Sequence, residues 1–338
     1  MNASQRGEAA LIAAVVSACP SRPSPVGPGD DCALIPTGPR RVLTTDALVE
    51  GTHFLRAHPP RALGHKTLAV NLSDVAAMGA SPEAFVLAAA LPPELPDAWW
   101  QAFAEGLGAY AAGAGVYLAG GDTVRASGPL TLTVTAWGTV PDSGPGKDRL
   151  LLRSGGQPGD LLMVQGPIGR AGRGLERWLG APRSDAWPDP GPATPTASED
   201  PCLRHHLAPE PPLWAGPWAL DHGATAGMDL SDGLATDLPR LAAASGVVLV
   251  VDLDQLPDDP ALADVDPRQR AAWGEDYGLV VLVPAPLAPT FEARGFAAIG
   301  RALAGQTLQP TVAPVIWRDG GREVAPVAAG FHHFGSSD

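Results

Sequence analysis

The feature that most restricts the fold of this chain is a regular alternation of strand-length apolar runs and helical stretches. Residues 41–50, 83–91 and 130–140 are short and rich in β-branched or small apolar side chains, which predicts strands. Apolar residues recur at helical spacing in 60–79 and 96–115, which predicts helices. With the segment VYLAGGDT interpreted as a strand followed by a turn, the first half is expected to run β-α-β-α-β-β, an order typical of α/β domains.

The second half continues this alternation after a Pro- and Gly-rich stretch at 141–149, which predicts a domain boundary. We therefore expect an α/β fold class, of the α+β type, with domains over residues 1–145 and 146–338. The segment 183–201 is rich in Pro, Ala, Ser and Asp and predicts a flexible insertion without chemistry. The expected strands of the second half are 160–166, 225–230, 247–253 and 277–283, and the expected helices are 168–180, 210–221, 232–245 and 260–272.

The chain is acidic, with 36 Asp and Glu against 23 Lys and Arg, a net charge of −13. Such a protein is poorly suited to nucleic acid or to an anionic membrane, and a phosphate ligand would need divalent cations. The three cysteines form no Cys-x-x-Cys pair, which argues against a zinc site or a disulfide framework. No apolar run reaches membrane-spanning length, and residues 1–20 predict a short amphipathic helix, so we expect a cytoplasmic protein.

Aspartates adjoin Gly, Ser or Thr in five segments at the edges of predicted elements. The tripeptide Leu-Ser-Asp occurs twice, at 72–74 and 230–232, inside apolar segments where an unpaired carboxylate would be costly. Carboxylates and hydroxyls suit Mg²⁺, which proteins usually bind through one or two carboxylates plus phosphates. Because five segments exceed the needs of one ion, we expect several ions, or ions with phosphates. The segments are 27–35, 43–54, 71–74, 119–123 and 227–233.

Each acidic segment also has an ordinary structural interpretation. Asp46 could lie in a strand-end turn, and Ser231 with Asp232 could cap the following helix. Asp74 is harder to explain in this way, because it shares a helix face with Asn71. If the structural interpretation held for all five acidic segments, five separate coincidences would be required.

Other candidate residues stand outside these segments. His53 is a lone histidine, a type that more often makes structural hydrogen bonds than it catalyses. Glu275 and Asp276 precede a buried strand, where a functional carboxylate is expected. The chain contains no Walker A sequence and no protein-kinase Gly-rich loop.

Seven motifs occur in order across nearly the whole chain: GDDCALI, TTDALVEGTHF, KTLAVNLSDVAAMGASP, GGDT, RSGGQPGD, MDLSDGLATDL and GEDYGLVV. The set resembles the thiamine-monophosphate kinase family, within the superfamily of aminoimidazole ribonucleotide synthetase, selenophosphate synthetase and a hydrogenase maturation factor. The resemblance implies a two-domain synthetase-like fold in which the N-terminal domain forms a β-barrel in a homodimer. ATP and thiamine monophosphate would lie between this domain and the C-terminal α/β domain.

The resemblance also implies residue roles. The positions that match Mg²⁺ ligands are Asp31, Thr44, Thr45, Asp46, Asp74, Asp122, Asp229 and Asp232. Nucleotide contacts match Gly121, Asp122, Arg153 and Ser231. Contacts to the thiamine substrate match His53, Glu275 and Phe331. Among these, the residues expected to act in catalysis are Asp46, Asp122, Asp229 and Arg153.

This resemblance implies a kinase that transfers the γ-phosphoryl group of ATP directly to the phosphate of thiamine monophosphate. The acceptor is already an anion near neutral pH, so positioning and charge neutralisation by several Mg²⁺ ions would suffice without a strong base. Three positions depart from the family pattern: Trp273 replaces a usual Gly, Phe331 stands where Trp or Tyr is common, and Ala114 stands where a Tyr is often found.

Two alternatives remain open at this point. Trp273 could crowd or stack on the substrate, which allows a paralogue that binds ATP without turnover or uses another acceptor. A related ATP-dependent ring-forming synthetase is the second alternative. A selenophosphate synthetase would need a reactive Cys in a Gly-rich N-terminal loop, and the maturation factor a C-terminal Cys, and the sequence has neither.

Overall fold

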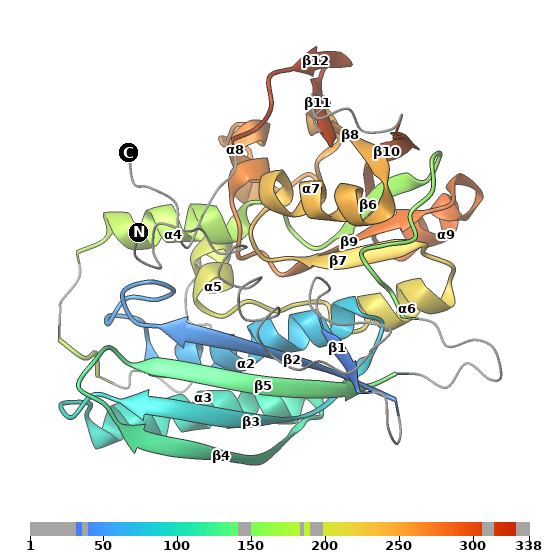
Figure 1. Cartoon of the computed structure of the whole chain (residues 1–338). Coiled ribbons are helices and arrows are strands. Elements are labelled where there is room, and N and C mark those ends of the chain that lie inside the picture. The colour runs from blue at the N-terminus through green and yellow to red at the C-terminus, as the bar shows by residue number, and fades with distance from the viewer. Residues whose placement is uncertain are drawn as a thin grey trace, which may run out of the picture.

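The computed structural model describes residues 32–35, 40–140, 150–182, 186–189, 199–305 and 314–328. These residues form two α/β halves, each built around one mixed β-sheet (Figure 1). The expected boundary at 145/146 and the expected helix at 1–20 lie outside the described residues. Across the part of the chain that the structure describes, none of the helices has the length and apolar character needed to cross a membrane.

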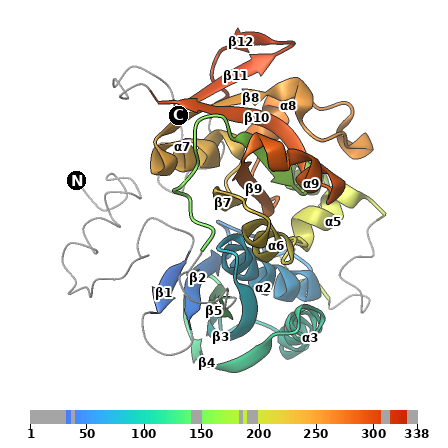
Figure 2. The same cartoon turned by 90° about the vertical axis from the view of Figure 1, so that its right-hand side faces the viewer.

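The first sheet has five strands in the order β1-β2-β5-β3-β4, and only β3 and β4 run parallel. Side chains alternate along β5, so that Leu132, Val134 and Ala136 are fully buried beneath the helices. Helices α2 and α3 both cover this one face (Figure 2). The strands are β1 Ala33–Ile35, β2 Arg41–Val49, β3 Ser81–Leu91, β4 Tyr117–Arg125 and β5 Thr131–Thr139, and the helices are α2 Pro60–Ala77 and α3 Asp97–Ala114.

Helix α2 is buried along nearly its whole length, because it lies between the first sheet with α3 on one side and the second half on the other (Figure 2). Its approach to α3 depends on two glycines. A Cβ on Gly64 would lie 2.1 Å from the carbonyl oxygen of Phe103, and one on Gly106 would lie 2.1 Å from that of Arg61. The two backbones therefore touch, which no larger residue at either position would allow.

The second sheet has seven strands in the order β12-β11-β8-β10-β6-β9-β7. Helix α7 packs on one face through Leu234, Leu238 and Leu241, and α6 and α9 cover the other. The strands are β6 Leu161–Gln165, β7 Ala226–Leu230, β8 Val247–Asp252, β9 Gly278–Val283, β10 Ala297–Ala304, β11 Val315–Asp319 and β12 Arg322–Val324. The helices are α4 Arg170–Gly180, α5 Pro201–Leu207, α6 Ala215–Asp221, α7 Leu234–Ser245, α8 Pro267–Ala272 and α9 Ala288–Ala293, with 3₁₀ turns η2 Leu253–Gln255, η3 Pro260–Leu262 and η4 Ala285–Leu287.

The two-domain α/β architecture is confirmed, but several predicted elements are corrected. The segment 116–123 is not a strand that ends in a turn, because β4 continues through both glycines to Arg125 while paired with β3. The expected helix 210–221 begins only at Ala215, since the prolines before it cannot donate backbone hydrogen bonds. The expected helix 260–272 is divided into η3 and α8.

The insertion expected at 183–201 is also anchored at one point. In its described part, Trp187 packs edge-on against Trp99 of α3, with ring centroids 5.2 Å apart, and the guanidinium of Arg56 lies 4.8 Å from its ring. The segment therefore contacts the first half of the chain, although its sequence composition alone predicts no fixed contact.

Candidate functional site

Acidic residues of β2 and α2 lie side by side beneath the second half. The Thr44 hydroxyl donates to Asp74 Oδ2 at 2.7 Å, and the backbone N–H of Asp46 donates to Asn71 Oδ1 at 3.1 Å. Asn71 and Asp74 occupy one face of α2, as their spacing predicts. These contacts bring two of the five acidic segments together.

A third acidic segment joins them from the second half. The hydroxyl of Ser73 donates to Asp229 Oδ2 at 3.1 Å, which links α2 to the end of β7. Asp229 is only 3% exposed. Ser73, Asp229 and Tyr277 line a small cavity of about 10 Å³, roughly the space of one water molecule. The first copy of Leu-Ser-Asp thus contacts the residue that directly precedes the second copy.

Tyr277 is a buried tyrosine that lines the same small cavity as Asp229. Burial raises the pKa of Tyr277 well above its usual value, and the negative charges of Glu275, Asp46, Asp229 and Asp74 raise it further. Tyr277 is therefore a neutral hydroxyl in an acidic site.

The oxygen donors at this junction fit Mg²⁺ ions that are bound jointly by the protein and a phosphate ligand. Among the described residues, no group of three His, Cys, Asp or Glu side chains is close enough to hold an ion alone. The oxygen atoms of Thr44, Asp74 and Asp229 are nevertheless hard ligands at one junction. Mg²⁺ commonly uses one or two carboxylates, water and substrate phosphates rather than a protein cage. The residues fit ions that arrive with phosphates.

Asp232 and Ser231 have surroundings different from those of Asp229. Arg240 Nη1 contacts Asp232 Oδ2 at 2.6 Å and Asp237 Oδ1 at 3.1 Å, so the Asp232 carboxylate is held by a cation. The suggestion that Ser231 and Asp232 cap the helix is wrong, because α7 begins at Leu234 after Gly233 and has no side-chain cap.

Two expected nucleotide residues lie on the edge strand of the first sheet. Gly121 pairs with Leu87 and Asp122 with Ala88, and both lie in β4, which is exposed along its whole length. Strands β5 and β3 separate β4 from β2, which at normal strand spacing places Asp122 about 14 Å from Asp46. Within one chain, the structure does not bring Asp122 to the Asp46–Asp74–Asp229 junction.

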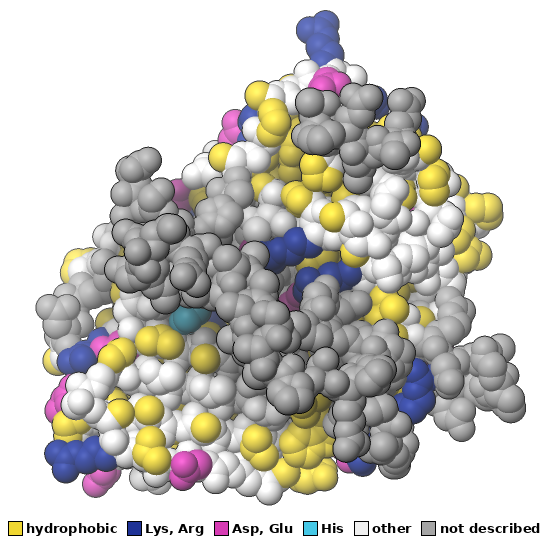
Figure 3. Space-filling view, viewed as in Figure 1, with side chains coloured by type: hydrophobic (Ala, Val, Ile, Leu, Met, Phe, Trp, Pro, Cys, Tyr) yellow, Lys and Arg dark blue, Asp and Glu magenta, His cyan; other side chains and the backbone are white. Residues whose placement is uncertain are grey.

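Arg153 lies in the connection that leads into β6. Its carbonyl oxygen accepts a 2.7 Å hydrogen bond from the hydroxyl of Ser245, at the end of α7. In the view of Figure 3, Lys and Arg side chains gather with acidic side chains between the two halves. This junction therefore holds positive charge beside its carboxylates.

The expected substrate residues separate into three cases. His53 follows β2 in a turn, where its Nδ1 accepts a 3.0 Å hydrogen bond from Val49 N–H. Glu275 has a positive φ of 66°, and its carboxylate contacts Lys66 Nζ at 2.8 Å and His206 Nδ1 at 3.2 Å. Phe331, like the expected metal ligand Asp31, lies outside the described residues.

Opposing effects set the charge of Glu275. Burial by itself would raise the pKa of its carboxyl group, but Lys66 and His206 outweigh burial and hold that pKa well below its usual range. The carboxylate is thus ionised, with its side chain 30% exposed. It can attract a cationic group of a ligand.

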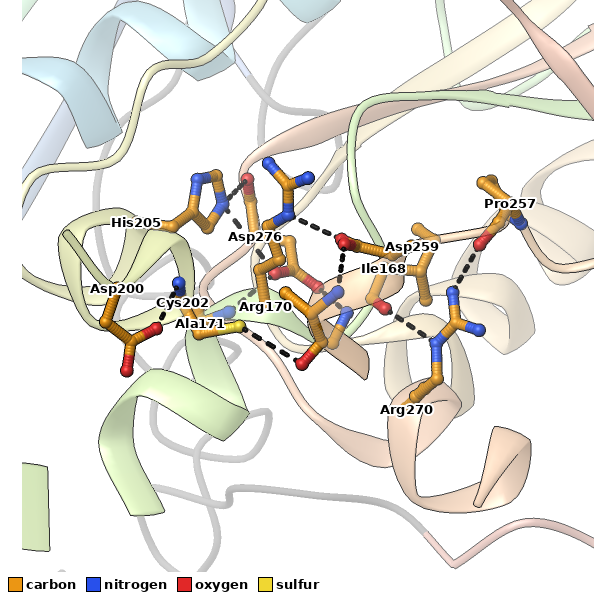
Figure 4. Close-up of polar contacts among 12 residues, drawn as sticks. Ile168, Arg170, Ala171, Asp200, Cys202, His205, Pro257, Asp259, Arg270 and Asp276 are labelled. Carbon is orange, nitrogen blue, oxygen red and sulfur yellow. Dashed lines mark hydrogen bonds and ion pairs between the residues drawn. The ribbon is translucent and has the colours of Figure 1, made fainter. Parts of the chain in front are cut away.

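Asp276 has a structural role, unlike its neighbour. Its carboxylate accepts hydrogen bonds from Gly169 N–H at 2.5 Å and Ala171 N–H at 2.9 Å, where α4 begins (Figure 4). His205 Nε2 lies 3.0 Å from its carbonyl oxygen. Burial raises the pKa of Asp276 to about 7 despite these donors. Only Glu275 of the Glu-Asp pair faces the first half.

Trp273 does not behave as a substrate-stacking residue. Its indole lies against α4 at Gly172, where an added Cβ would be 2.1 Å from the ring. It packs with a small cluster formed by Cys202, Leu262 and Val265. The substitution of Trp for Gly is accommodated by a glycine on the opposing helix.

The sequence interpretation missed Lys66, Ser73, His206 and Tyr277. Lys66 carries a usable signal, since it is the one charged residue in the stretch of helix at 66–72. A buried Lys requires a partner, and the structure supplies Glu275.

A buried histidine at this junction makes stability depend on pH. His58 is 1% exposed, and its Nε2 lies 3.0 Å from the carbonyl oxygen of Leu207. Burial lowers its pKa well below the usual value, helped by the charges of Lys66 and His206. The folded state keeps His58 neutral, whereas the unfolded state binds a proton below about pH 6.5. The contribution of the neutral His58 to the free energy of unfolding is therefore fully present above that pH and decreases as the pH falls.

We expect His58→Gln to flatten this dependence, because Gln cannot titrate. The slope of unfolding free energy against pH should decrease by about 1 kcal/mol per pH unit between about pH 5 and 6. Urea unfolding across this range measures it, with the exposed His222→Gln as the matched control. An unchanged slope in His58→Gln would contradict the assignment of this pH dependence to His58.

The chain matches two family descriptions, "AIR synthase related protein, N-terminal domain" over residues 29–140 and "AIR synthase related protein, C-terminal domain" over residues 157–313. Thiamine-monophosphate kinase of Salmonella typhimurium is 40% identical over 269 residues, which cover 76% of each chain. The structure of AaThiL complexed with AMPPCP and TMP is 27% identical, with a TM-score of 0.80, and covers 98% of this chain and 99% of that one. Thiamine-monophosphate kinase from Stenotrophomonas maltophilia K279a is 36% identical, with a TM-score of 0.70, and covers 88% and 92%.

Both α/β halves match the AIR synthase related proteins, so the chain belongs to that class. More narrowly, the chain belongs to the thiamine-monophosphate kinase family, which confirms the resemblance seen in its motifs.

Proposed function

We propose that this protein transfers the γ-phosphoryl group of ATP directly to thiamine monophosphate, giving thiamine diphosphate and ADP. The observation that carries the proposal is the acidic junction, where helix α2 contacts Asp229 of the second half through Ser73 and contacts Thr44 and Asp46 of β2 through Asp74 and Asn71. Its family membership supplies the substrate class, and AaThiL, a similar structure, binds AMPPCP and TMP.

The chemistry is a single displacement. An oxygen of the thiamine monophosphate phosphate group forms a bond to the γ-phosphorus as the bond to the β,γ-bridging oxygen breaks, and ADP leaves with that electron pair. Mg²⁺ ions, when bound, would neutralise the phosphates at the carboxylates. The proposed ligands are Asp31, Thr44, Thr45, Asp46, Asp74, Asp122, Asp229 and Asp232.

The protein's own residues position the two anions. Arg153, with its backbone held by Ser245, would place positive charge near the polyphosphate, and Ser231 would contact the nucleotide. Glu275 would present an ionised carboxylate to the cationic thiamine group, and His53 and Phe331 are the other proposed contacts to this substrate. Because the acceptor is an anion, alignment and charge neutralisation are the contributions needed from the site.

A homodimer would explain how Asp122 can take part in a site from which it is distant within its own chain. Strand β4 is an exposed edge, with Tyr117 and Leu118 each 56% exposed and Val124 49% exposed. Apolar side chains are also spread over the outer face of the first sheet in Figure 3. Long exposed edges and apolar faces are usually covered. We place the dimer contact here, where two sheets could close into a barrel and Gly121 and Asp122 of the partner subunit could reach the junction.

The proposal retains domains at 1–145 and 146–338, and a cytoplasmic location where ATP is available. It does not retain the silent paralogue. That alternative rested on Trp273, whose indole packs against α4 rather than beside the Glu275 carboxylate.

The test is formation of thiamine diphosphate by the full chain from ATP and thiamine monophosphate, separated by chromatography. We expect product with Mg²⁺, none with EDTA, and none when thiamine replaces its monophosphate. Folded protein that binds ATP and forms no thiamine diphosphate would refute the proposal.

A further inference from the structure

Lys66 is the most deeply buried cation among the described residues, and the proposed mechanism does not use it. It is 1% exposed in the middle of α2, in the first half of the chain. Its ammonium group reaches across to the second half, where Nζ lies 2.8 Å from Glu275 Oε1 and donates to the His206 carbonyl oxygen at 3.2 Å. A buried charge of this kind is retained only when it is fully paired.

Glu275 is held from several directions at once. Its N–H donates to the Ser231 carbonyl oxygen at 2.7 Å, and its carboxylate oxygens meet Lys66 and His206 separately. Its φ of 66° is uncommon for a residue with a side chain. Such a conformation persists where its surroundings over-determine it, and strained residues of this kind cluster at ligand sites.

Helix α2 relates this contact to the phosphate end of the site. Lys66 and Ser73 lie seven residues apart, which puts them on the same helix face about 10 Å from each other. Ser73 donates to Asp229, and Lys66 contacts Glu275. One rigid helix of the first half therefore holds two carboxylates of the second half at a fixed separation.

We propose that Lys66 is a positioning residue for the acceptor: together with His206 it orients Glu275, so that α2 sets the distance between the thiamine-binding carboxylate and the phosphate-binding junction. The inference rests on the proposed function. It differs from a purely structural salt bridge, because the 30% exposed Glu275 side chain remains open to a ligand while Lys66 is enclosed.

The test compares Michaelis constants in the full chain. Lys66→Met keeps the length of the side chain and removes its charge. We expect KM for thiamine monophosphate to rise about tenfold or more, as for loss of a charge-assisted contact, with KM for ATP within about twofold. Arg173→Met is the matched control, since it breaks the Arg173–Glu176 pair of α4, at 2.9 Å, in which neither Lys66 nor Glu275 takes part.

A double variant separates positioning from stability. Lys66→Met/Glu275→Gln removes both charges, so it should recover the unfolding free energy lost in Lys66→Met. It should not recover KM for thiamine monophosphate, whereas a purely structural role would restore both. If Lys66→Met fails to fold, the same comparison can be made with two other variants. Lys66→Arg should raise KM for thiamine monophosphate less, and His206→Ala should raise it more.

Three results would overturn the inference: unchanged acceptor KM in folded Lys66→Met, equal rises for ATP and acceptor, or full recovery of acceptor KM in the double variant. Each requires an active wild-type protein. Absence of thiamine diphosphate from the wild type would instead refute the proposed function, so the two failures are distinguishable.

Discussion

Asp229→Asn is expected to lower kcat for thiamine diphosphate formation by about a thousandfold, the size of effect seen when one preorganised charge is lost from a phosphoryl or oxyanion site. The change removes a negative charge from a proposed Mg²⁺ ligand, so less positive charge would be held at the substrate phosphates. The fold should survive, because Asn keeps an oxygen that can accept from Ser73 and relieves repulsion with Asp46 and Asp74. Steady-state rates and urea unfolding of the same preparation measure both effects.

Asp160→Asn is the matched control for this prediction. Asp160 is 5% exposed and accepts from Thr225 Oγ1 at 2.6 Å and Gln157 N–H at 2.8 Å, near the opposite end of β7 from Asp229. Its replacement should reduce stability and leave kcat close to wild type. Full activity in Asp229→Asn, or in Asp46→Asn, would show that these carboxylates do not take part.

The second large effect concerns the contact between the halves. Gly216 of α6 lies against α2, and an added Cβ would be 1.6 Å from the Ala76 carbonyl oxygen. Because the obstacle is backbone, Gly216→Ala should force α6 away from α2 and reduce the unfolding free energy by about 3 kcal/mol. The same shift would disturb the link between Ser73 and Asp229, so activity should fall as well.

Gly108→Ala in α3 provides the comparison. An added Cβ there meets no atom within 4 Å. Alanine favours the helix over glycine by about 1 kcal/mol, so this variant should be equally or more stable than wild type. Equal stability of the two variants in urea unfolding would contradict the close approach of α6 to α2.

The order of elements could be predicted from the sequence because it depends on local periodicity. Strands β2 and β5 and helices α2 and α3 fall within the predicted segments, and β3 begins at Ser81, before its predicted start at 83. The extent of β4 could not be predicted, since its two glycines are turn formers locally and become strand residues only through pairing with β3. The helix α5 lies just after a Pro-rich segment that obscured its start.

The residue types of the candidate site could be predicted from the sequence, but their arrangement in space could be predicted only in part. The contact between Ser73 and Asp229 agrees with the expectation that the acidic segments 71–74 and 227–233 share one site. The burial of α2 on all sides required the second half to be in place, so the role of Lys66 was not visible from periodicity. The location of Asp122 on an edge strand follows only from strand order.

The central claim is direct transfer of the phosphoryl group between two anions held at the junction of the halves. The most direct measurement uses ATP made chiral at the γ-phosphorus with three oxygen isotopes and determines the configuration of that phosphorus in thiamine diphosphate. A single in-line displacement predicts inversion. Retention would require a phosphorylated enzyme as intermediate and would contradict the account.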